Sequence, residues 1–293
     1  MENTAVATKA KKPTSQFKKK LRKFCNNRLA MIGFIVLVIM IGACIAAPLL
    51  TQYDQATPDF SALSQAPSQT HIFGTDSIGR DIFARTLYGG RISIMIAVVS
   101  AVIGAVIGCI LGAIAGYFGG KVDWFLVRIC EIWQTIPQLL LVMLIMAFIG
   151  QGTWNLVLIF AFSGWMGVFR MVRGEFLSAR EETYVQVCRA FGMSKAAIMF
   201  KQILPSVLTT VVITFTLDIP GYMLTEATLS FLGVGVPMST ATWGTMLNAS
   251  RSVKIITNCW WAWVIPGACI SLFVMATNFL GDGLRDILDP RQQ

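Results

Sequence analysis

Long uncharged apolar stretches constrain this chain more than any other feature. Residues 31–50 and 92–118 carry no charge, and four further stretches carry at most two charges each. A membrane-crossing helix needs roughly 20 such residues, and a mean hydropathy of +0.65 with only 13% charged residues excludes an ordinary soluble domain. We therefore expect an all-α polytopic membrane protein with six transmembrane helices. The expected spans are residues 31–50, 92–118, 124–150, 154–170, 203–231 and 260–280.

The distribution of positive charge predicts that both termini are cytoplasmic. Residues 1–30 form a basic leader without the cleavage pattern of a signal peptide. With the amino terminus inside, 19 of the 24 Lys and Arg residues fall on the inner side, as the positive-inside rule requires. An odd number of spans would break this bias. The five outer exceptions are Arg80, Arg85, Arg91, Arg251 and Lys254.

Small residues and prolines predict details within the spans. In the second span a small residue recurs every fourth position, which places a ridge on one helix face and allows another helix to approach closely. Pro137 predicts a kink in the third span, and Pro220-Gly221 predicts an interruption of the fifth. The seven cysteines are interpreted as small core residues. The ridge consists of Ser100, Gly104, Gly108, Gly112 and Gly116.

We divide the chain into four regions. Residues 1–30 are the cytoplasmic leader, and residues 31–91 hold the first span and a polar extracytoplasmic segment. Residues 92–281 form a core of five spans, which includes a charged inner connector at about 180–202, and residues 282–293 are a cytoplasmic tail.

The inner connector is predicted to hold a short amphipathic helix. Its apolar positions fall at i, i+3, i+4 and i+7. Gly192 suits a C-terminal stop, and Ser194 can cap a second helix. Two interpretations stay open from the residues alone: the stripe packs on the membrane or its own bundle, or it docks into a groove on a soluble partner. The apolar positions are Tyr184, Val187, Cys188 and Phe191.

The connector resembles the cytoplasmic loop of ABC importer permeases. That loop has the signature Glu-Ala-Ala, three residues, Gly, nine residues, then Ile-x-Leu-Pro. Gly192 and Leu204-Pro205 match at the right separation. Gln186-Val187-Cys188 stands where Glu-Ala-Ala would be, and Gln202 stands where Ile would be.

Three further stretches resemble the dipeptide, oligopeptide and nickel permease family, specifically its shorter "C" subunit. They are residues 73–81, residues 229–235 with Trp243-Gly244 after them, and residues 281–291. Together they cover nearly the whole chain in order. The first stretch contains Gly74, Thr75, Asp76, Gly79, Arg80 and Asp81.

The resemblance implies the type I ABC importer fold in a bacterial cytoplasmic (inner) membrane. It also implies a heterodimer with a related permease subunit, two cytoplasmic ATPase subunits, an extracytoplasmic solute-binding protein and a peptide substrate. In that family the loop around Gly192 acts as the coupling helix, where the ATPases dock. The resemblance carries this role to Tyr184, Val187, Cys188, Arg189, Ala190, Phe191, Gly192 and Ser194.

The chain itself is not expected to be an enzyme. It contains no G-x-x-x-x-G-K-[ST] phosphate-binding loop, so ATP and magnesium would bind to the partner ATPase subunits and this chain would bind no cofactor. No metal site is expected either, because His71 is the only histidine. The 74–81 motif has no nucleophile paired with a base. We interpret its Asp/Arg pair as a tie between the outer segment and the bundle, with contact to the binding protein as the alternative.

Two carboxylates within the fifth span are candidates for the solute pathway. Asp218 and Glu226 are eight residues apart, close to one helix face, and flank Pro220-Gly221. A carboxylate near the membrane centre costs roughly 2.5–3.5 kcal/mol, so it should face the bundle interior or water. We hypothesise that Asp218 lines the pathway and binds a peptide amine; the alternative is a structural hydrogen bond to a neighbouring helix. Glu226 is the weaker candidate, expected near the outer interface.

Other functions stay open at this stage. Similar permeases serve nickel chelates and other small solutes. An ion-coupled secondary transporter would use Asp218 and Glu226 for protons or Na⁺, but such proteins show paired repeats with broken helices in matching positions, and only one broken span is expected here. An intramembrane enzyme is disfavoured because no His-Glu-x-x-His or comparable pair occurs.

Overall fold

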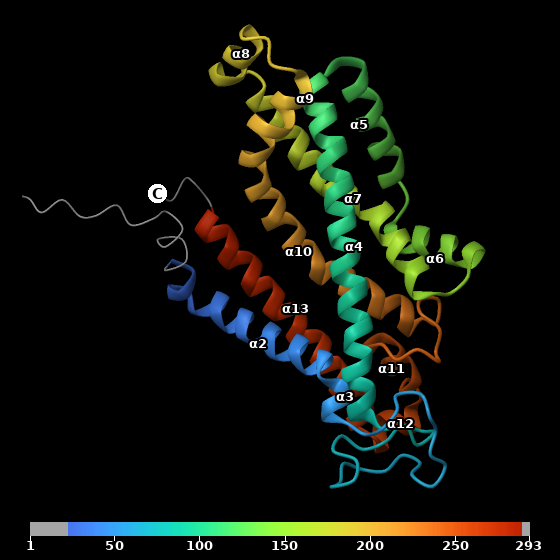
Figure 1. The fold of residues 1–293 in the computed structure, drawn as a ribbon. Helices are drawn as coiled ribbons and strands as arrows, with labels where there is room; N and C mark the ends of the chain where they lie inside the picture. The colour runs from blue at the N-terminus through green and yellow to red at the C-terminus, as the bar shows by residue number, and fades with distance from the viewer. Residues whose placement is uncertain (1–22, 289–293) are drawn as a thin grey trace, which may run out of the picture.

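The computed structural model describes residues 23–288, and this part of the chain is a bundle of long helices (Figure 1). Most of the basic leader, residues 1–22, and the end of the tail, residues 289–293, lie outside the described residues. Five helices are long and apolar enough to cross a membrane, and a bent pair makes up a sixth candidate span. The five are α2 (Arg28–Ile45), α4 (Ile82–Phe118), α7 (Thr153–Ala179), α10 (Leu204–Phe231) and α13 (Trp261–Leu288), and the pair is α5 (Gly120–Gln134) with α6 (Gln138–Ile149).

Short helices lie at the two ends of the bundle (Figure 1). α8 (Thr183–Ala190), α9 (Lys195–Ala197) and the π-helical turn η1 (Ile198–Ile203) join α7 to α10 at one end. At the other end are α3 (Ala47–Leu50), α11 (Trp243–Ala249) and α12 (Val253–Asn258), together with the long loop before α4. The sequence patterns did not predict α11 and α12. The expected all-helical class is confirmed for the described residues, in which the β contacts are limited to one bridge, Thr75 to Asp81.

The small-residue ridge explains why α4 and α7 form the central pair. α4 packs more extensively against α7 than against any other helix. A Cβ atom on Gly112 would lie 2.7 Å from the Phe169 carbonyl oxygen, and one on Gly116 would lie 2.6 Å from the Arg173 carbonyl oxygen. The backbones therefore approach too closely for any larger side chain. The helix that the ridge was expected to receive is α7 of this same chain.

The second span begins ten residues earlier than predicted, because α4 starts at Ile82 rather than at residue 92. Asp81 caps it by accepting a hydrogen bond from the Ala84 amide at 2.7 Å. Arg91, expected in a loop, lies in this helix, and its guanidinium donates to the carbonyl oxygens at the end of α2, including that of Ile45 at 2.6 Å. Arg91, which marked a loop in the sequence, instead joins α4 to the end of α2 through hydrogen bonds.

The third span is broken rather than kinked. α5 and α6 meet at an angle of 84°, with Thr135 to Pro137 between them. Pro137 disfavours helical geometry in the residue before it, so α5 ends there and α6 starts again at Gln138. The sequence thus predicted the position of the bend at Pro137 correctly, but the bend is larger than the kink that was expected.

The fifth span is not interrupted, contrary to expectation. α10 runs continuously from Leu204 to Phe231 with Pro220 inside it. A proline removes one backbone hydrogen bond, which a membrane helix tolerates when its neighbours pack against it. The fourth and sixth spans also extend further than expected, to Ala179 and Leu288. All seven cysteines lie within the described residues as free thiols, and Cys44, Cys130 and Cys259 are buried.

Candidate functional site

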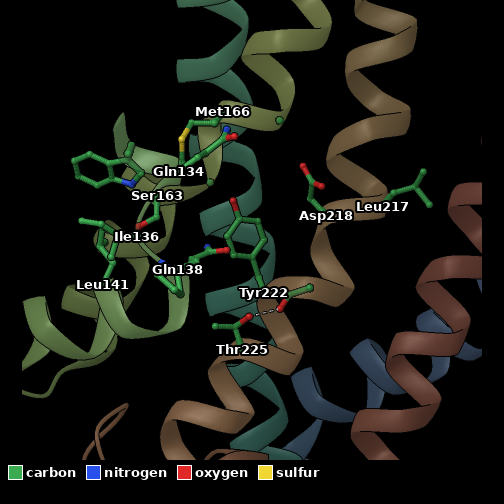
Figure 2. A pocket seen from close by; sticks show the side chains of 15 residues that line it. Gln134, Ile136, Gln138, Leu141, Ser163, Met166, Leu217, Asp218, Tyr222 and Thr225 are labelled. Atoms are coloured by element: carbon green, nitrogen blue, oxygen red, sulfur yellow. Dashed lines mark hydrogen bonds between the residues drawn. The ribbon is translucent and has the colours of Figure 1, made fainter. Parts of the chain in front are cut away.

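A cavity of about 450 Å³ opens beside the middle of α10 (Figure 2). Its walls come from the α5–α6 break, from α7 and from α10. The described residues that line it include one carboxylate, Asp218, and no Lys, Arg or His. Its volume falls within the range of pockets that hold small molecules. The structure therefore places one of the two candidate carboxylates on a cavity.

Asp218 is half-buried, and no described side chain carries a positive charge that pairs with it. Figure 2 shows its side chain projecting from α10 into the same space as the Tyr222 hydroxyl. Among residues 23–288 it forms no hydrogen bond or ion pair with another side chain. A carboxylate in a membrane bundle is costly unless it is paired or hydrated, so this one requires water or a ligand.

Tyr222 lies one helical turn beyond Asp218 and is held by close contact with two other helices. A Cβ atom on Gly164 of α7 would overlap the Tyr222 hydroxyl, and one on Gly104 of α4 would lie 3.3 Å from it. The Tyr222 ring also packs against Phe160, with ring centroids 5.6 Å apart. These glycines create the space that the tyrosine occupies. Its hydroxyl is thereby fixed at the edge of the cavity.

The opposite wall comes from the broken third span. Trp133, Ile136 and Leu141 supply apolar surface, while Gln134 and Gln138 supply amides (Figure 2). The Gln134 side chain is held in place, because its carbonyl oxygen accepts a hydrogen bond of 2.9 Å from Arg170. Sequence reasoning missed this wall and Tyr222. The available signal was the pair of glutamines on either side of Pro137 in an otherwise apolar stretch.

Glu226 lies in a different environment from Asp218. It is 0% exposed, and it accepts hydrogen bonds from Ser93 at 3.1 Å and from Ser230 at 2.9 Å. The Ser93 hydroxyl also accepts from the Trp243 amide at 3.2 Å, so the network joins α4, α10 and α11. Glu226 does not line the cavity and is not at an exposed interface. Glu226 thus makes the structural hydrogen bonds to neighbouring elements that were weighed as the alternative for Asp218.

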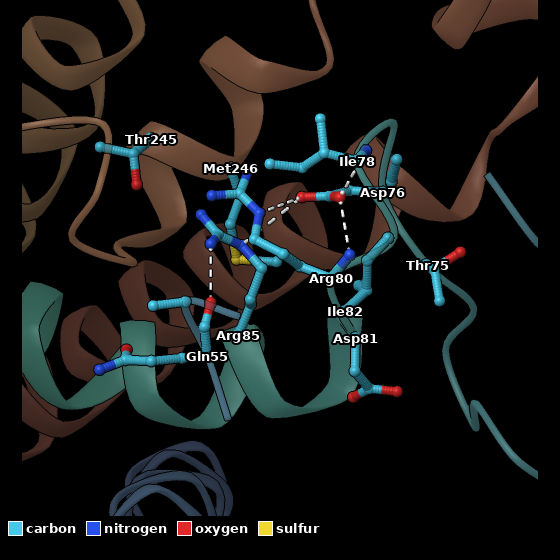
Figure 3. Close-up of polar contacts among 12 residues, drawn as sticks. Gln55, Thr75, Asp76, Ile78, Arg80, Asp81, Ile82, Arg85, Thr245 and Met246 are labelled. Carbon is cyan, nitrogen blue, oxygen red and sulfur yellow. Dashed lines mark hydrogen bonds and ion pairs between the residues drawn. The ribbon is translucent and has the colours of Figure 1, made fainter. Parts of the chain in front are cut away.

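The 74–81 motif forms a cluster of hydrogen bonds and ion pairs around Asp76 at the α11 end of the bundle (Figure 3). Asp76 accepts hydrogen bonds from the Arg80 side chain at 2.7 Å and from the Ile78 and Arg80 amides at 3.0 Å. Arg85 is buried, with its Nε atom 4.0 Å from Asp76 and one Nη atom donating to the Gln55 carbonyl oxygen at 2.9 Å. Figure 3 shows both guanidinium groups gathered beside this one carboxylate.

The same motif bonds to the helices beneath it. Asp81 caps α4 and also lies 2.8 Å from the His71 imidazole. The Thr75 carbonyl oxygen accepts a hydrogen bond of 3.1 Å from the Trp261 indole of α13. Gly74 and Gly79 have positive φ angles of 74° and 84°, which favour glycine. These are the contacts expected of a motif that ties the loop to the bundle.

The connector between α7 and α10 has the predicted local structure. α8 is followed by Gly192 with a φ of 75°, and the Ser194 hydroxyl accepts a hydrogen bond of 3.3 Å from the Ala197 amide. Val185 anchors α8 because its side chain is fully buried against the bundle. The Arg189 guanidinium stacks over Tyr117 at 5.3 Å.

Three of the four predicted apolar positions of the connector face away from the bundle. Tyr184 is 43% exposed, Val187 is 46% exposed and Phe191 is 87% exposed. Cys188 is half-buried, and Ala190 and Gly192 are exposed. The described part of the bundle therefore leaves Tyr184, Val187 and Phe191 largely uncovered, while Cys188 packs against it, so packing on the chain's own bundle accounts for only part of the stripe. Large exposed apolar side chains of this kind mark contact sites.

Known proteins resemble this chain over nearly its full length. Residues 108–293 match the family described as binding-protein-dependent transport system inner membrane component, and residues 15–67 match the N-terminal TM domain of oligopeptide transport permease C. The oligopeptide transport system permease protein OppC of Bacillus subtilis is 39% identical over 96% of this chain and 92% of its own length. The OppC protein of Escherichia coli is 39% identical over 93% and 90%. The dipeptide transport system permease protein DppC of Bacillus subtilis is 36% identical over 99% and 91%.

Proposed function

This chain belongs to the family of binding-protein-dependent transport system inner membrane components, and from that premise we propose that it is a permease subunit of an ATP-driven importer of di- and oligopeptides. The observation that carries the proposal is the full-length similarity to peptide permeases combined with a cavity inside the bundle. The chain would form half of the translocation pathway. A related permease subunit would supply the other half.

The energy would come from separate subunits. We propose that two ATPase subunits bind ATP and magnesium and dock on the α8 segment in the cytoplasm. The support is the exposed stripe of Tyr184, Val187 and Phe191 on a helix that Val185 fixes to the bundle. An element that transmits motion from the ATPases must be fixed to the spans on one side and free to bind a partner on the other, and α8 meets both conditions. Both chain termini would lie on this side of a bacterial inner membrane.

The solute would arrive from the opposite face, delivered by a solute-binding protein. The loop before α4 supports this assignment, because the hydrogen bonds and ion pairs around Asp76 hold it in place at the α11 end of the bundle. A loop held in one conformation is suited to repeated docking of a soluble partner. Peptide is favoured over nickel chelates because the similar proteins named above are oligopeptide and dipeptide permeases.

Uptake measured with separate energy sources tests the proposal. The complete complex is placed in proteoliposomes with the binding protein outside, and entry of a labelled peptide is followed with ATP inside, with a proton gradient alone, or with neither. We expect entry only with internal ATP. Entry driven by the gradient without ATP would identify an ion-coupled transporter instead. Labelled nickel chelate offered in place of peptide tests the remaining substrate class.

A further inference from the structure

Two carboxylates on α10 differ in whether hydrogen-bond donors of the chain contact them. Glu226 accepts hydrogen bonds from two serine hydroxyls and is sealed from solvent. Asp218, two turns away, faces a cavity and has no side-chain partner within residues 23–288. A carboxylate that serves only packing would be satisfied as Glu226 is. Asp218 is left to water or to a ligand that enters the cavity.

We propose that Asp218 is a selectivity site that binds the free α-ammonium group of the peptide in transit, so that the permease itself discriminates against peptides with a blocked amino terminus. This inference rests on the proposed function and deepens it. It adds a chemical selection step inside the membrane to whatever selection the binding protein makes.

The charge of the cavity supports a cationic group as the ligand. Asp218 is the one ionisable carboxylate among the described lining residues, and none of them is basic. In a site that is partly shielded from water, a fixed negative charge attracts an ammonium group and repels a carboxylate. The peptide's own carboxylate would therefore point away from α10. The amino end would be held on this subunit.

The shape of the cavity supports a neutral side chain next to that ammonium group. Across from Asp218 lie the apolar surfaces of Ile136 and Leu141, with Met166 from α7 (Figure 2). Trp133 also lines the cavity. This surface is suited to an uncharged first side chain of the peptide. Amides from Gln134 and Gln138 can meet the peptide bond that follows.

The position of Asp218 is also well defined. It lies on a continuous helix, and its neighbour Tyr222 is locked between α4 and α7 by the close approaches at Gly104 and Gly164. Sites held on regular helices select ligands more sharply than sites on loops. The Tyr222 hydroxyl borders the same space and limits how far an ammonium group can shift.

The test compares a free peptide with its blocked form in the complete complex. Alanyl-leucine and N-acetyl-alanyl-leucine are offered to proteoliposomes that contain the permease pair, the ATPases and internal ATP, with the binding protein outside. The affinity of the binding protein for each peptide is measured separately, and uptake is compared at saturation of that protein. The variants are Asp218→Asn, Asp218→Glu and Thr228→Val, which removes a hydroxyl from the same helix outside the cavity.

We expect the unmodified complex to favour the free peptide by about 10-fold in the rate of uptake at saturation, which corresponds to about 1.4 kcal/mol. Asp218→Asn should reduce this preference to about twofold, while Asp218→Glu and Thr228→Val should retain it. The inference is overturned if the unmodified complex shows no preference at equal loading, or if Asp218→Asn slows both peptides equally. A complex that imports neither peptide with ATP present contradicts the proposed function itself, so the two failures are distinguishable.

Discussion

Replacing Phe191 by Asp should detach the ATPase subunits from this chain while leaving its fold intact. Phe191 is 87% exposed, so almost the whole ring is available to a partner and almost none of it supports the bundle. Burying a phenylalanine side chain contributes about 1.5–3 kcal/mol. Loss of that contribution weakens docking by roughly 10- to 150-fold. The aspartate adds a further penalty because its charge would be desolvated in an apolar groove.

The assay for this prediction is co-purification of the ATPase subunits with the tagged permease, followed by ATP-driven uptake. Phe191→Leu retains most of the apolar area and should retain docking. Gln186→Glu is the matched charge control: it adds a negative charge to the same helix outside the stripe, at the position of Glu in the loop signature that the connector resembles. Undiminished recovery of the ATPases with Phe191→Asp, or equal loss with Gln186→Glu, would refute the assignment of the stripe as the contact surface.

Three further predictions concern the bundle. Gly164→Ala should displace the Tyr222 ring and lower the free energy of unfolding by about 1–3 kcal/mol. Gly167→Ala on the same helix should be tolerated, because a Cβ atom there would have no described atom within 4 Å apart from those of its own helix turn. Thermal unfolding in detergent compares the two variants. Glu226→Ala should leave two serine hydroxyls without their partner and cost about 1–3 kcal/mol, yet leave the preference for free peptides unchanged in the uptake assay. Asp76→Ala should cost about 3–5 kcal/mol, because two buried guanidinium groups lose their counter-charge, and limited proteolysis of the loop before α4 should accelerate.

Local patterns were sufficient to predict much of the helical framework. Uncharged stretches located the spans because a helix in lipid must satisfy its own backbone and present apolar side chains. The glycine ridge predicted a close helix contact, and the structure shows α7 against Gly112 and Gly116. The stop at Gly192 and the cap at Ser194 were also predictable, since both depend on residues within one turn.

Features that depend on distant contacts were not predictable from local patterns. The start of α4 was placed too late because Arg85 and Arg91 looked like loop residues, and their partners, Gln55 and the end of α2, lie at least 30 positions away in the chain. The 84° break at Pro137 depends on how α6 packs, which a proline alone does not determine. Asp218 could be nominated from the sequence, but the cavity it faces exists only because α10 meets the broken third span.

We propose that this chain converts ATP hydrolysis by partner subunits into movement of a peptide. The most direct measurement follows both quantities in the same proteoliposomes while the loaded binding protein is titrated outside. We predict that hydrolysis and peptide accumulation rise together at a constant ratio, and that Phe191→Asp abolishes the accumulation. Accumulation that continues after internal ATP is removed, or that is unaffected by Phe191→Asp, would contradict this coupling role.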